Sequence, residues 1–191
     1  NDFTWKDFQT RNNSELVAIF GNFINRAVVL THKYYNGEVP QCGTLLPQDQ
    51  AVLDELILFP TRVGKSIEKY RFREASQEML NLARLGNKYL ADEEPWKRIK
   101  DQPERLPTIM YTSIQIAAAL SSICEPFLPQ SAQKLRGILN IDTPFTWDTI
   151  ANKAELLKTT HIIGKQTLLF SKIEDDVITR QLDKLAQTKE E

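Results

Sequence analysis

The chain has 191 residues, of which 41% are hydrophobic and 26% charged, a composition that excludes an intrinsically disordered protein. A chain of this length can bury about two-thirds of its unfolded surface, so we expect it to fold without disulfides or a metal ion. The net charge of −1 excludes a general attraction to nucleic acid, so any RNA contact must be local. Two cysteines (Cys42 and Cys124) and two histidines (His32 and His161) form no familiar metal motif. We expect reduced thiols, a cytoplasmic location and no metal site.

Apolar residues recur at three- and four-residue spacing and glycine is scarce, which predicts a largely helical chain. The first helix should run from a cap at Asn13 or Ser14 to about Tyr34, with the Asn-Gly pair at 36–37 as its stop signal. Residues 16–30 are apolar enough to resemble a membrane span, but a central arginine and two asparagines are costly in lipid. We therefore expect a buried helix and no membrane contact.

Prolines divide the middle of the chain. Pro47 opens a second helix from its first turn, where a missing N–H costs nothing, and Pro60 should kink or split that helix. Residues 72–90 have the apolar stripe of a long amphipathic helix. A turn at residues 92–97 should then lead into a short helix that has Pro95 near its first position.

The second half of the chain continues the helical pattern. In chain order, the sequence predicts a helix at 106–124, a helix at 130–139 after two prolines, a mostly irregular stretch at 142–164, a brief extended piece at 167–170 and a last helix at about 174–186. The apolar residues of the last helix should point inward: Val177, Ile178, Leu182 and Leu185. No repeat or linker interrupts the pattern, so we expect an all-α helical bundle that forms one domain over residues 1–191.

One face of the first predicted helix is polar amid apolar neighbours. Asn22, Asn25 and Arg26 are three and four positions apart and share that face. Asparagine presents a donor and an acceptor together, and arginine forms planar two-point hydrogen bonds, so this set can read a base edge. The pattern alone favours the commoner case, a polar strip that faces water or caps neighbouring helix ends.

Trp96 follows a proline in a predicted turn, and basic residues stand at positions 97, 98 and 100. Such a ring is a platform on which a base stacks with about 1–3 kcal/mol, beside charges that attract phosphate. The alternative is a tryptophan that closes the end of the bundle, which is commoner for a single ring. Trp5 and Trp147 have apolar neighbours and no basic cluster, so we expect both in the core.

Signatures of catalysis are missing from the sequence. It contains no glycine-rich phosphate loop, no Cys-x-x-Cys pair and no Ser-His-Asp arrangement. The acidic run at 174–176 is most simply the favourable negative first turn of the last helix. We therefore expect no catalytic residue in this chain.

Four stretches carry a resemblance to a known family. They are Asp7-Phe8-x-x-Arg11-x-Asn13-x-Glu15-Leu16, Gly21-Asn22-x-x-Asn25-Arg26, Ala83-Arg84-x-Gly86-Asn87-Lys88-Tyr89 leading to Glu94-Pro95-Trp96-Lys97, and Phe170-Ser171-Lys172-Ile173-Glu174. In this order, and over nearly the whole chain, they resemble the anticodon-binding domain of bacterial methionyl-tRNA synthetases. The resemblance implies a helical bundle of the class I synthetase type that recognises the CAU anticodon of methionine tRNA.

The resemblance also implies roles for individual residues. Asn22 and Arg26 match the family's asparagine and arginine that hydrogen-bond anticodon bases, and Trp96 matches the tryptophan that stacks on the first anticodon base. The remaining candidates accompany these three: Asn25 on the same helix face, Asp92 and Pro95 in the recognition turn, and Lys172, where the family can carry an arginine.

A parent enzyme is implied as well, a methionine–tRNA ligase with an upstream catalytic domain. That domain would use ATP and Mg, and Zn where it carries a zinc-binding insertion. The family's His-x-Gly-His and Lys-Met-Ser-Lys-Ser signatures are absent from these 191 residues, so we expect no cofactor and no methionine activation here. The expected partners are methionine tRNA and the catalytic domain, with no DNA.

Two alternatives stay open. The first is the related domain of a valyl-, isoleucyl- or leucyl-tRNA synthetase, against which the Glu-Pro-Trp-Lys context and the Asn22/Arg26 pair argue. The second is a helical protein-interaction scaffold. An exposed Trp96 near Arg26 would favour RNA, whereas a Trp96 buried under helix ends would favour the scaffold.

Overall fold

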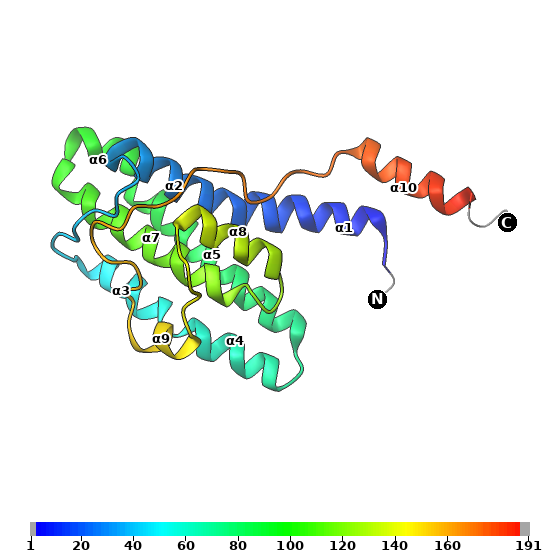
Figure 1. Cartoon of the computed structure of the whole chain (residues 1–191), viewed down its shortest axis with the longest axis horizontal. Helices are drawn as coiled ribbons and strands as arrows, with labels where there is room; N and C mark the ends of the chain where they lie inside the picture. Colours follow the sequence, from blue (N-terminus) through cyan, green and yellow to red (C-terminus); the bar gives the residue numbers. More distant parts are fainter. Residues whose placement is uncertain (1–2, 188–191) are drawn as a thin grey trace.

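The computed structural model describes residues 3–187, and its elements are helices (Figure 1). A π-helix (Asn12–Gly21) joins the first two α-helices into one long rod. The α-helices are α1 (Trp5–Arg11), α2 (Asn22–Tyr35), α3 (Pro47–Leu56), α4 (Phe59–Glu68), α5 (Phe72–Glu93), α6 (Pro95–Asp101), α7 (Leu106–Ile123), α8 (Pro129–Leu139), α9 (Trp147–Asn152) and α10 (Asp175–Gln187). Between residues 3 and 187 the β-structure is one isolated bridge, Glu38 to Ile162, so the predicted all-α fold is confirmed.

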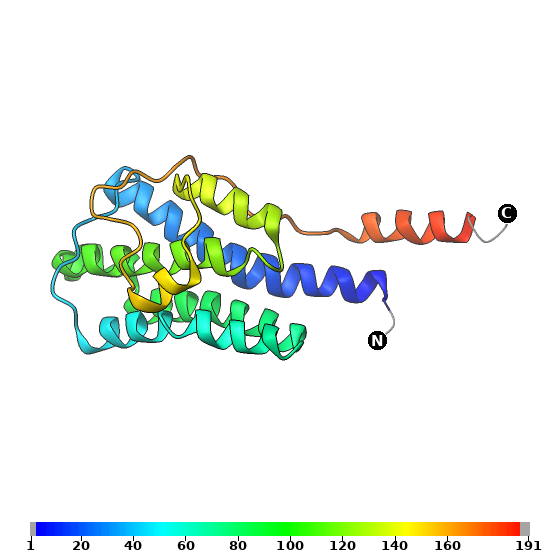
Figure 2. The ribbon, with the colours of Figure 1, turned by 60° about the horizontal axis from the view of Figure 1, so that its bottom comes forward.

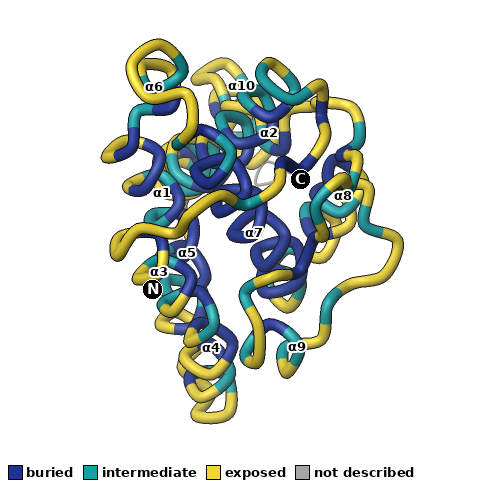
Figure 3. Tube along the Cα trace, turned by 90° about the vertical axis from the view of Figure 1, so that its left-hand side faces the viewer, coloured by how far each residue is buried: buried dark blue, intermediate teal, exposed yellow. Residues whose placement is uncertain are grey.

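Helix α7 lies in the centre of the bundle and contacts α5, α2, α8 and α3, as the dark tube in Figure 3 shows. The helical stretch Pro103–Ile123 is long and apolar enough to cross a membrane by those two criteria alone. In this structure 94% of its apolar window is buried inside the molecule. Since the core helix of a bundle meets the same criteria, its apolar character is accounted for by packing.

The first helix begins well before the predicted cap at Asn13 or Ser14. Its cap is Thr4, whose Oγ1 accepts a hydrogen bond from the N–H of Asp7 at 3.0 Å. The Asn13 side chain instead donates to the C=O of Ile173 and accepts from its N–H, both at 2.9 Å. The prediction was wrong because a polar residue inside a helix looks like a cap when its partner lies far away in the sequence.

Proline punctuation was predicted correctly. The second predicted helix is split into α3 and α4, and Pro60 lies in the first turn of α4. The stretch at 142–164 is mostly irregular, as predicted, and contains a short helix, α9, whose first turn is capped by Thr146 through the N–H of Thr149. Residues 167–170 form no strand.

Helix α10 projects away from the bundle (Figures 1 and 2), which overturns the prediction that its apolar residues point inward. Ile178 is buried and Val177 half-buried, but Leu182 is 52% exposed and Leu185 50% exposed. The last helix starts with the acidic turn predicted from residues 174–176 and is fastened to α1 near that turn. An amphipathic stripe predicts that one face is apolar, and it says nothing about which surface covers that face.

The tryptophans away from the candidate site are not both in the core. Trp5 is half-buried and forms a surface aromatic cluster with Phe3 and Phe8, with ring centroids 5.1 and 6.1 Å away. Phe3 is 66% exposed, so the core prediction for Trp5 was wrong. Trp147 is half-buried and packs against the core, close to the prediction.

Helices α2 and α5 approach closely at Gly86. A Cβ atom added to Gly86 would lie 2.3 Å from Cε2 of Phe23, a fully buried residue of α2. No real side chain fits at that distance, so glycine permits this contact. The contact sets the first turn of α2 against the last third of α5, where the candidate site lies.

Replacing Gly86 with alanine should therefore destabilise the fold by about 1–3 kcal/mol, because the added methyl group overpacks the core. Urea unfolding measures the loss. Gly137→Ala is the control, since a Cβ there meets nothing within 4 Å. That residue lies inside α8, where alanine should stabilise the helix by about 0.5–1 kcal/mol. Equal effects of both substitutions would contradict the close approach.

Candidate nucleic-acid interface

Arg26 and Trp96 meet although 70 positions separate them in the printed sequence. The guanidinium carbon of Arg26, on α2, lies 5.0 Å from the ring centroid of Trp96, in the first turn of α6. This is cation–π geometry, which orients the planar guanidinium against the ring. Partial burial lowers the pKa of Arg26, yet an arginine remains charged at any physiological pH. Trp96 keeps 39% of its surface exposed, so ring area remains for a ligand.

The corner between α5 and α6 presents Trp96. Glu94 adopts the left-handed conformation with φ of 45°, and Pro95 opens α6. A proline disfavours the right-handed helical conformation in the residue before it, so α5 ends here. Pro95 itself is buried, which makes it a residue that shapes the corner. Its predicted place in the turn agrees with the structure, but its side chain is not on the surface that a base would touch.

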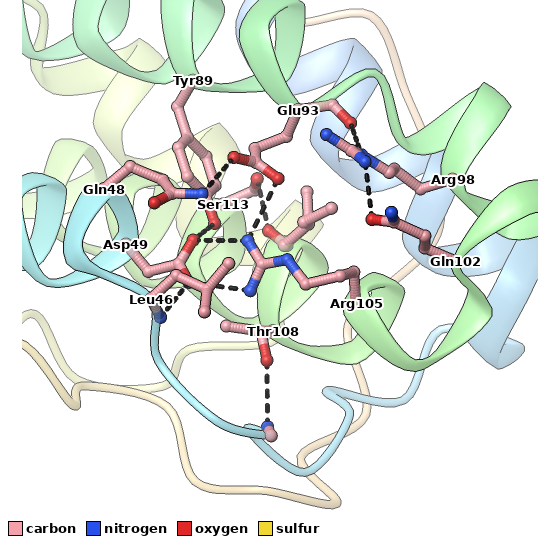
Figure 4. Close-up of polar contacts among 12 residues, drawn as sticks. Leu46, Gln48, Asp49, Tyr89, Glu93, Arg98, Gln102, Arg105, Thr108 and Ser113 are labelled. Carbon is pink, nitrogen blue, oxygen red and sulfur yellow. Dashed lines mark hydrogen bonds and ion pairs between the residues drawn. The ribbon is translucent and has the colours of Figure 1, made fainter.

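A buried polar network fastens this corner to the bundle (Figure 4). Arg105 donates to both carboxylate oxygens of Asp49, at 2.8 and 2.9 Å, and to Glu93 at 3.0 Å. The hydroxyl of Tyr89 donates to Asp49 at 2.6 Å. Asp49 is fully buried and Glu93 is 5% exposed, so the network lies out of water. Because Glu93 is the last residue of α5, the network fixes the point from which α6 departs.

The network shifts the pKa of Asp49 in two opposing ways. Burial raises that pKa, while hydrogen bonds from Arg105, from Tyr89 and from the N–H of Leu46 lower it more, so the net shift is downward. The carboxylate is therefore held ionised opposite Arg105, whose own pKa the same contacts raise. Sequence reasoning missed this cluster, because its members are spread over α3, α5 and the turn just before α7 and no spacing rule connects them.

The predicted polar face of α2 is present. Asn22 is exposed, and Asn25 and Arg26 are half-buried. Nδ2 of Asn22 donates to Oδ1 of Asn87 at 2.9 Å, and Nδ2 of Asn87 donates to the C=O of Ile19 at 2.8 Å. Asn25 accepts from the side chain of Gln166 at 3.3 Å. Asn22 and Asn25 thus contact neighbouring segments away from helix ends, and the Asn22 side chain also remains exposed.

A groove of about 470 Å³ borders this face. One wall is the π-helix and the start of α2, including Asn22 and Asn25, and the other is the segment Leu168–Phe170 with Lys172. Lys172 is exposed and places a positive charge at the groove. The structure therefore brings Asn22, Asn25 and Lys172 to one groove and Arg26 and Trp96 to one stack beside it.

Asp92 lies apart from these contacts. It is exposed on the last turn of α5 and forms an ion pair with Lys88, one turn earlier. Among the described residues, no hydrogen bond or ion pair joins Asp92 to Arg26 or Trp96. Trp96, in contrast, is partly exposed and lies against Arg26 of α2.

The combination of groups suits a single-stranded base. An aromatic ring supplies a stacking surface, a guanidinium supplies several donors in one plane, and an asparagine supplies an acceptor. Unpaired RNA bases are recognised by this chemistry, because their edges and faces are both accessible.

The chain is similar to known proteins in sequence and in fold. The sequence model described as the anticodon binding domain of methionyl tRNA ligase matches residues 39–190. The chain is 56% identical over 189 residues to a methionine–tRNA ligase of Flavobacterium psychrophilum, and 59% identical over 194 residues to one of Christiangramia forsetii. Each alignment covers 99% of this chain and 28% of the relative, so the chain spans little more than a quarter of their length.

Solved structures with a similar fold include the apo form of a Mycobacterium tuberculosis methionyl-tRNA synthetase. Its TM-score is 0.81 at 21% sequence identity, over 90% of this chain and 35% of that one. The complex of the same protein with methionyl-adenylate gives a TM-score of 0.80 at the same identity, over 88% of this chain and 33% of that one. At this identity the likeness concerns the fold of the bundle.

Proposed function

Since the chain belongs to the family of methionyl-tRNA ligase anticodon-binding domains, we propose that Arg26, Trp96 and Asn22 read the CAU anticodon of methionine tRNA. Trp96 stacks on the first anticodon base, and the two α2 side chains bond to base edges. Asn25 and Lys172 line the adjoining groove and accompany the neighbouring nucleotides. Pro95 holds the shape of the corner between α5 and α6. Asp92 contacts the RNA from the last turn of α5, at the edge of that corner.

The observation that carries this proposal is the stack of Arg26 on a partly exposed Trp96. A tryptophan that closes a bundle end would be buried, whereas 39% of this ring is exposed beside an oriented guanidinium. Base stacking on such a ring contributes about 1–3 kcal/mol. The exposure favours RNA recognition over a protein-interaction scaffold, in which the ring would support neighbouring helices.

For the longer protein we propose methionine–tRNA ligase activity with ATP and Mg in a separate catalytic domain, in the cytoplasm. Residues 1–191 would act as one anticodon-binding unit of that enzyme. Helix α6 and α10 lie at opposite ends of the molecule (Figure 1). A site at the α6 end leaves the opposite end free for the rest of the protein. The anticodon would then be held far from the place where methionine is joined to the tRNA.

A titration with RNA hairpins tests the proposal. The chain should bind an anticodon stem-loop carrying CAU more tightly than one carrying UAU, which differs only at the first anticodon base. Fluorescence anisotropy of a labelled hairpin measures both affinities at one stated salt concentration, because phosphate contacts make affinity salt-dependent. Equal affinities for the two hairpins would contradict anticodon reading by this surface.

Arg26→Lys should lose most of the preference for CAU although it keeps the positive charge. Lysine cannot form planar two-point bonds, and the loss of a good bidentate base contact costs about 1–3 kcal/mol of discrimination. The control is Arg62→Lys, because Arg62 also lies over an aromatic ring, 5.2 Å from Phe59, but on α4. If Arg26→Lys discriminates like the parent, Arg26 acts only as a charge.

A further inference from the structure

Asn87 lies on α5 and accepts a hydrogen bond from Asn22, one of the residues proposed to bind the anticodon. We propose that Asn87 fixes the orientation of the Asn22 side-chain amide, so that the carbonyl oxygen of Asn22 faces the RNA. Asn22 then acts as a hydrogen-bond acceptor and selects a base that carries an amino group. This inference rests on the proposed function, and it makes Asn87 a positioning residue for the first anticodon base.

The orientation follows from a chain of two hydrogen bonds that starts at the backbone. A backbone C=O can only accept, so the group of Asn87 that lies 2.8 Å from the C=O of Ile19 must be its NH2 group. The Oδ1 atom of Asn87 therefore faces the other way, toward Asn22. An oxygen there requires a donor, so Asn22 turns its own NH2 group to Asn87, at 2.9 Å.

Local backbone geometry makes this chain possible. Ile19 belongs to the π-helix, and its carbonyl oxygen has two lone pairs, one of which remains for a side chain after the helix bond. Asn87 reaches that carbonyl because its neighbour Gly86 lets α5 approach α2. Asn87 is half-buried, so its amide is only partly open to the solvent that would let it turn.

Reversing the Asn22 amide would have a cost. With the NH2 group turned outward, Oδ1 of Asn22 would face Oδ1 of Asn87, and two acceptors would repel. Restoring a bond would require Asn87 to turn as well, which would place its oxygen against the C=O of Ile19. The backbone carbonyl thus determines the polarity of both side chains, and Asn22 presents its oxygen outward.

Next to Arg26, this polarity matches the hydrogen-bonding edge of cytosine. Cytosine has an amino donor at N4 and acceptors at N3 and O2, so Oδ1 of Asn22 can accept from N4 while Arg26 donates. Uracil has an acceptor oxygen at position 4, which would meet the oxygen of Asn22. The pair therefore selects cytosine over uracil on the ring of Trp96.

The experiment compares three stem-loops that differ only in the first anticodon base: cytosine, uracil and pyrimidin-2-one, which lacks the amino group. The parent chain should bind the cytosine loop about tenfold more tightly than the pyrimidin-2-one loop. In Asn87→Ala this ratio should fall to about twofold, close to its value in Asn22→Ala. The matched control is Asn81→Ala on α5, which breaks a hydrogen bond from Arg84 at 2.8 Å and should keep the parent ratio.

A measurement without RNA separates this inference from the proposed function. In the free chain, the side-chain amide protons of Asn22 should exchange with water several times faster in Asn87→Ala than in the parent, as NMR of a 15N-labelled sample reports. Asn87→Ser leaves a hydroxyl that can donate to the C=O of Ile19 but removes the amide that joins Ile19 to Asn22. It should therefore lower the ratio of affinities for the cytosine and pyrimidin-2-one loops to about twofold, as Asn87→Ala does.

The outcomes are distinguishable. If Asn22→Ala removes the preference for the cytosine loop over the pyrimidin-2-one loop but Asn87→Ala keeps it, the positioning role of Asn87 is overturned and anticodon reading stands. If the parent chain binds all three loops equally, the proposed function itself is overturned. Should Asn87→Ala fail to fold, Asn87→Ser decides: a lost ratio supports the inference, and a preserved ratio contradicts it.

Discussion

Arg105→Ala should lower the free energy of unfolding by about 3–5 kcal/mol. The substitution leaves Asp49 fully buried and Glu93 5% exposed without the cation that binds both. Breaking a buried ion pair by removing one partner costs this much because the remaining charges are neither paired nor hydrated. Urea unfolding followed by circular dichroism measures the change. An unchanged slope of unfolding free energy against urea concentration would show that the variant and the parent expose the same surface on unfolding.

Arg136→Ala is the matched control for Arg105→Ala. The Arg136 side chain is 13% exposed, close to the 11% of Arg105, but its partner Glu125 is 42% exposed. Glu125 can regain water when Arg136 is removed, so we expect a loss of about 1–2 kcal/mol, mainly for the backbone carbonyl that Arg136 also bonds. A loss below about 1 kcal/mol for Arg105→Ala, or equal losses for both variants, would show that the network is not a buried charge cluster.

Local signals predicted most of the helices. Apolar spacing and the positions of Pro47, Pro60 and Pro95 located α3 to α6, because a proline acts on the backbone within one turn of itself. The same reasoning failed where a side chain serves a distant partner. Asn13 looked like a helix cap and instead binds Ile173. The apolar face of α10 was expected in the core, but Leu182 and Leu185 on it are about half exposed.

The site was predictable from the sequence only in part. That Asn22 and Arg26 share a face follows from helix geometry, but their meeting with Trp96 does not, since it depends on how α2 packs on the α5–α6 corner. The resemblance to a family supplied that pairing as an expectation. Nothing in the pattern marked Asn87 as the partner of Asn22, or Arg105 as the residue that joins Asp49 to Glu93. Hydrogen-bond partners distant in sequence are set by tertiary packing, which periodicity does not encode.

Trp96→Ala should weaken binding of the CAU stem-loop more than any other single substitution at the site, by about 1.5–4 kcal/mol. Loss of the stacking surface accounts for about 1–3 kcal/mol. Loss of the ring that orients Arg26 adds about 0.5–1 kcal/mol. Trp96→Phe keeps a π-face and should retain much of the affinity. The control for binding is Trp5→Ala, since Trp5 lies in the aromatic cluster on α1, away from α6 (Figure 1).

The stability of Trp96→Ala decides between stacking and packing. A ring that is 39% exposed contributes modestly to the core. The free energy of unfolding, measured by thermal unfolding, should therefore fall by much less than for a buried tryptophan. Truncation of a core tryptophan costs about 3–5 kcal/mol of stability. If Trp96→Ala lost that much stability while the folded fraction bound RNA as the parent does, Trp96 would be a structural residue. If stability is retained and the binding loss exceeds about 1 kcal/mol, the exposed ring itself meets the RNA, because weakening of the bundle is then excluded and the lost orientation of Arg26 accounts for only about 0.5–1 kcal/mol.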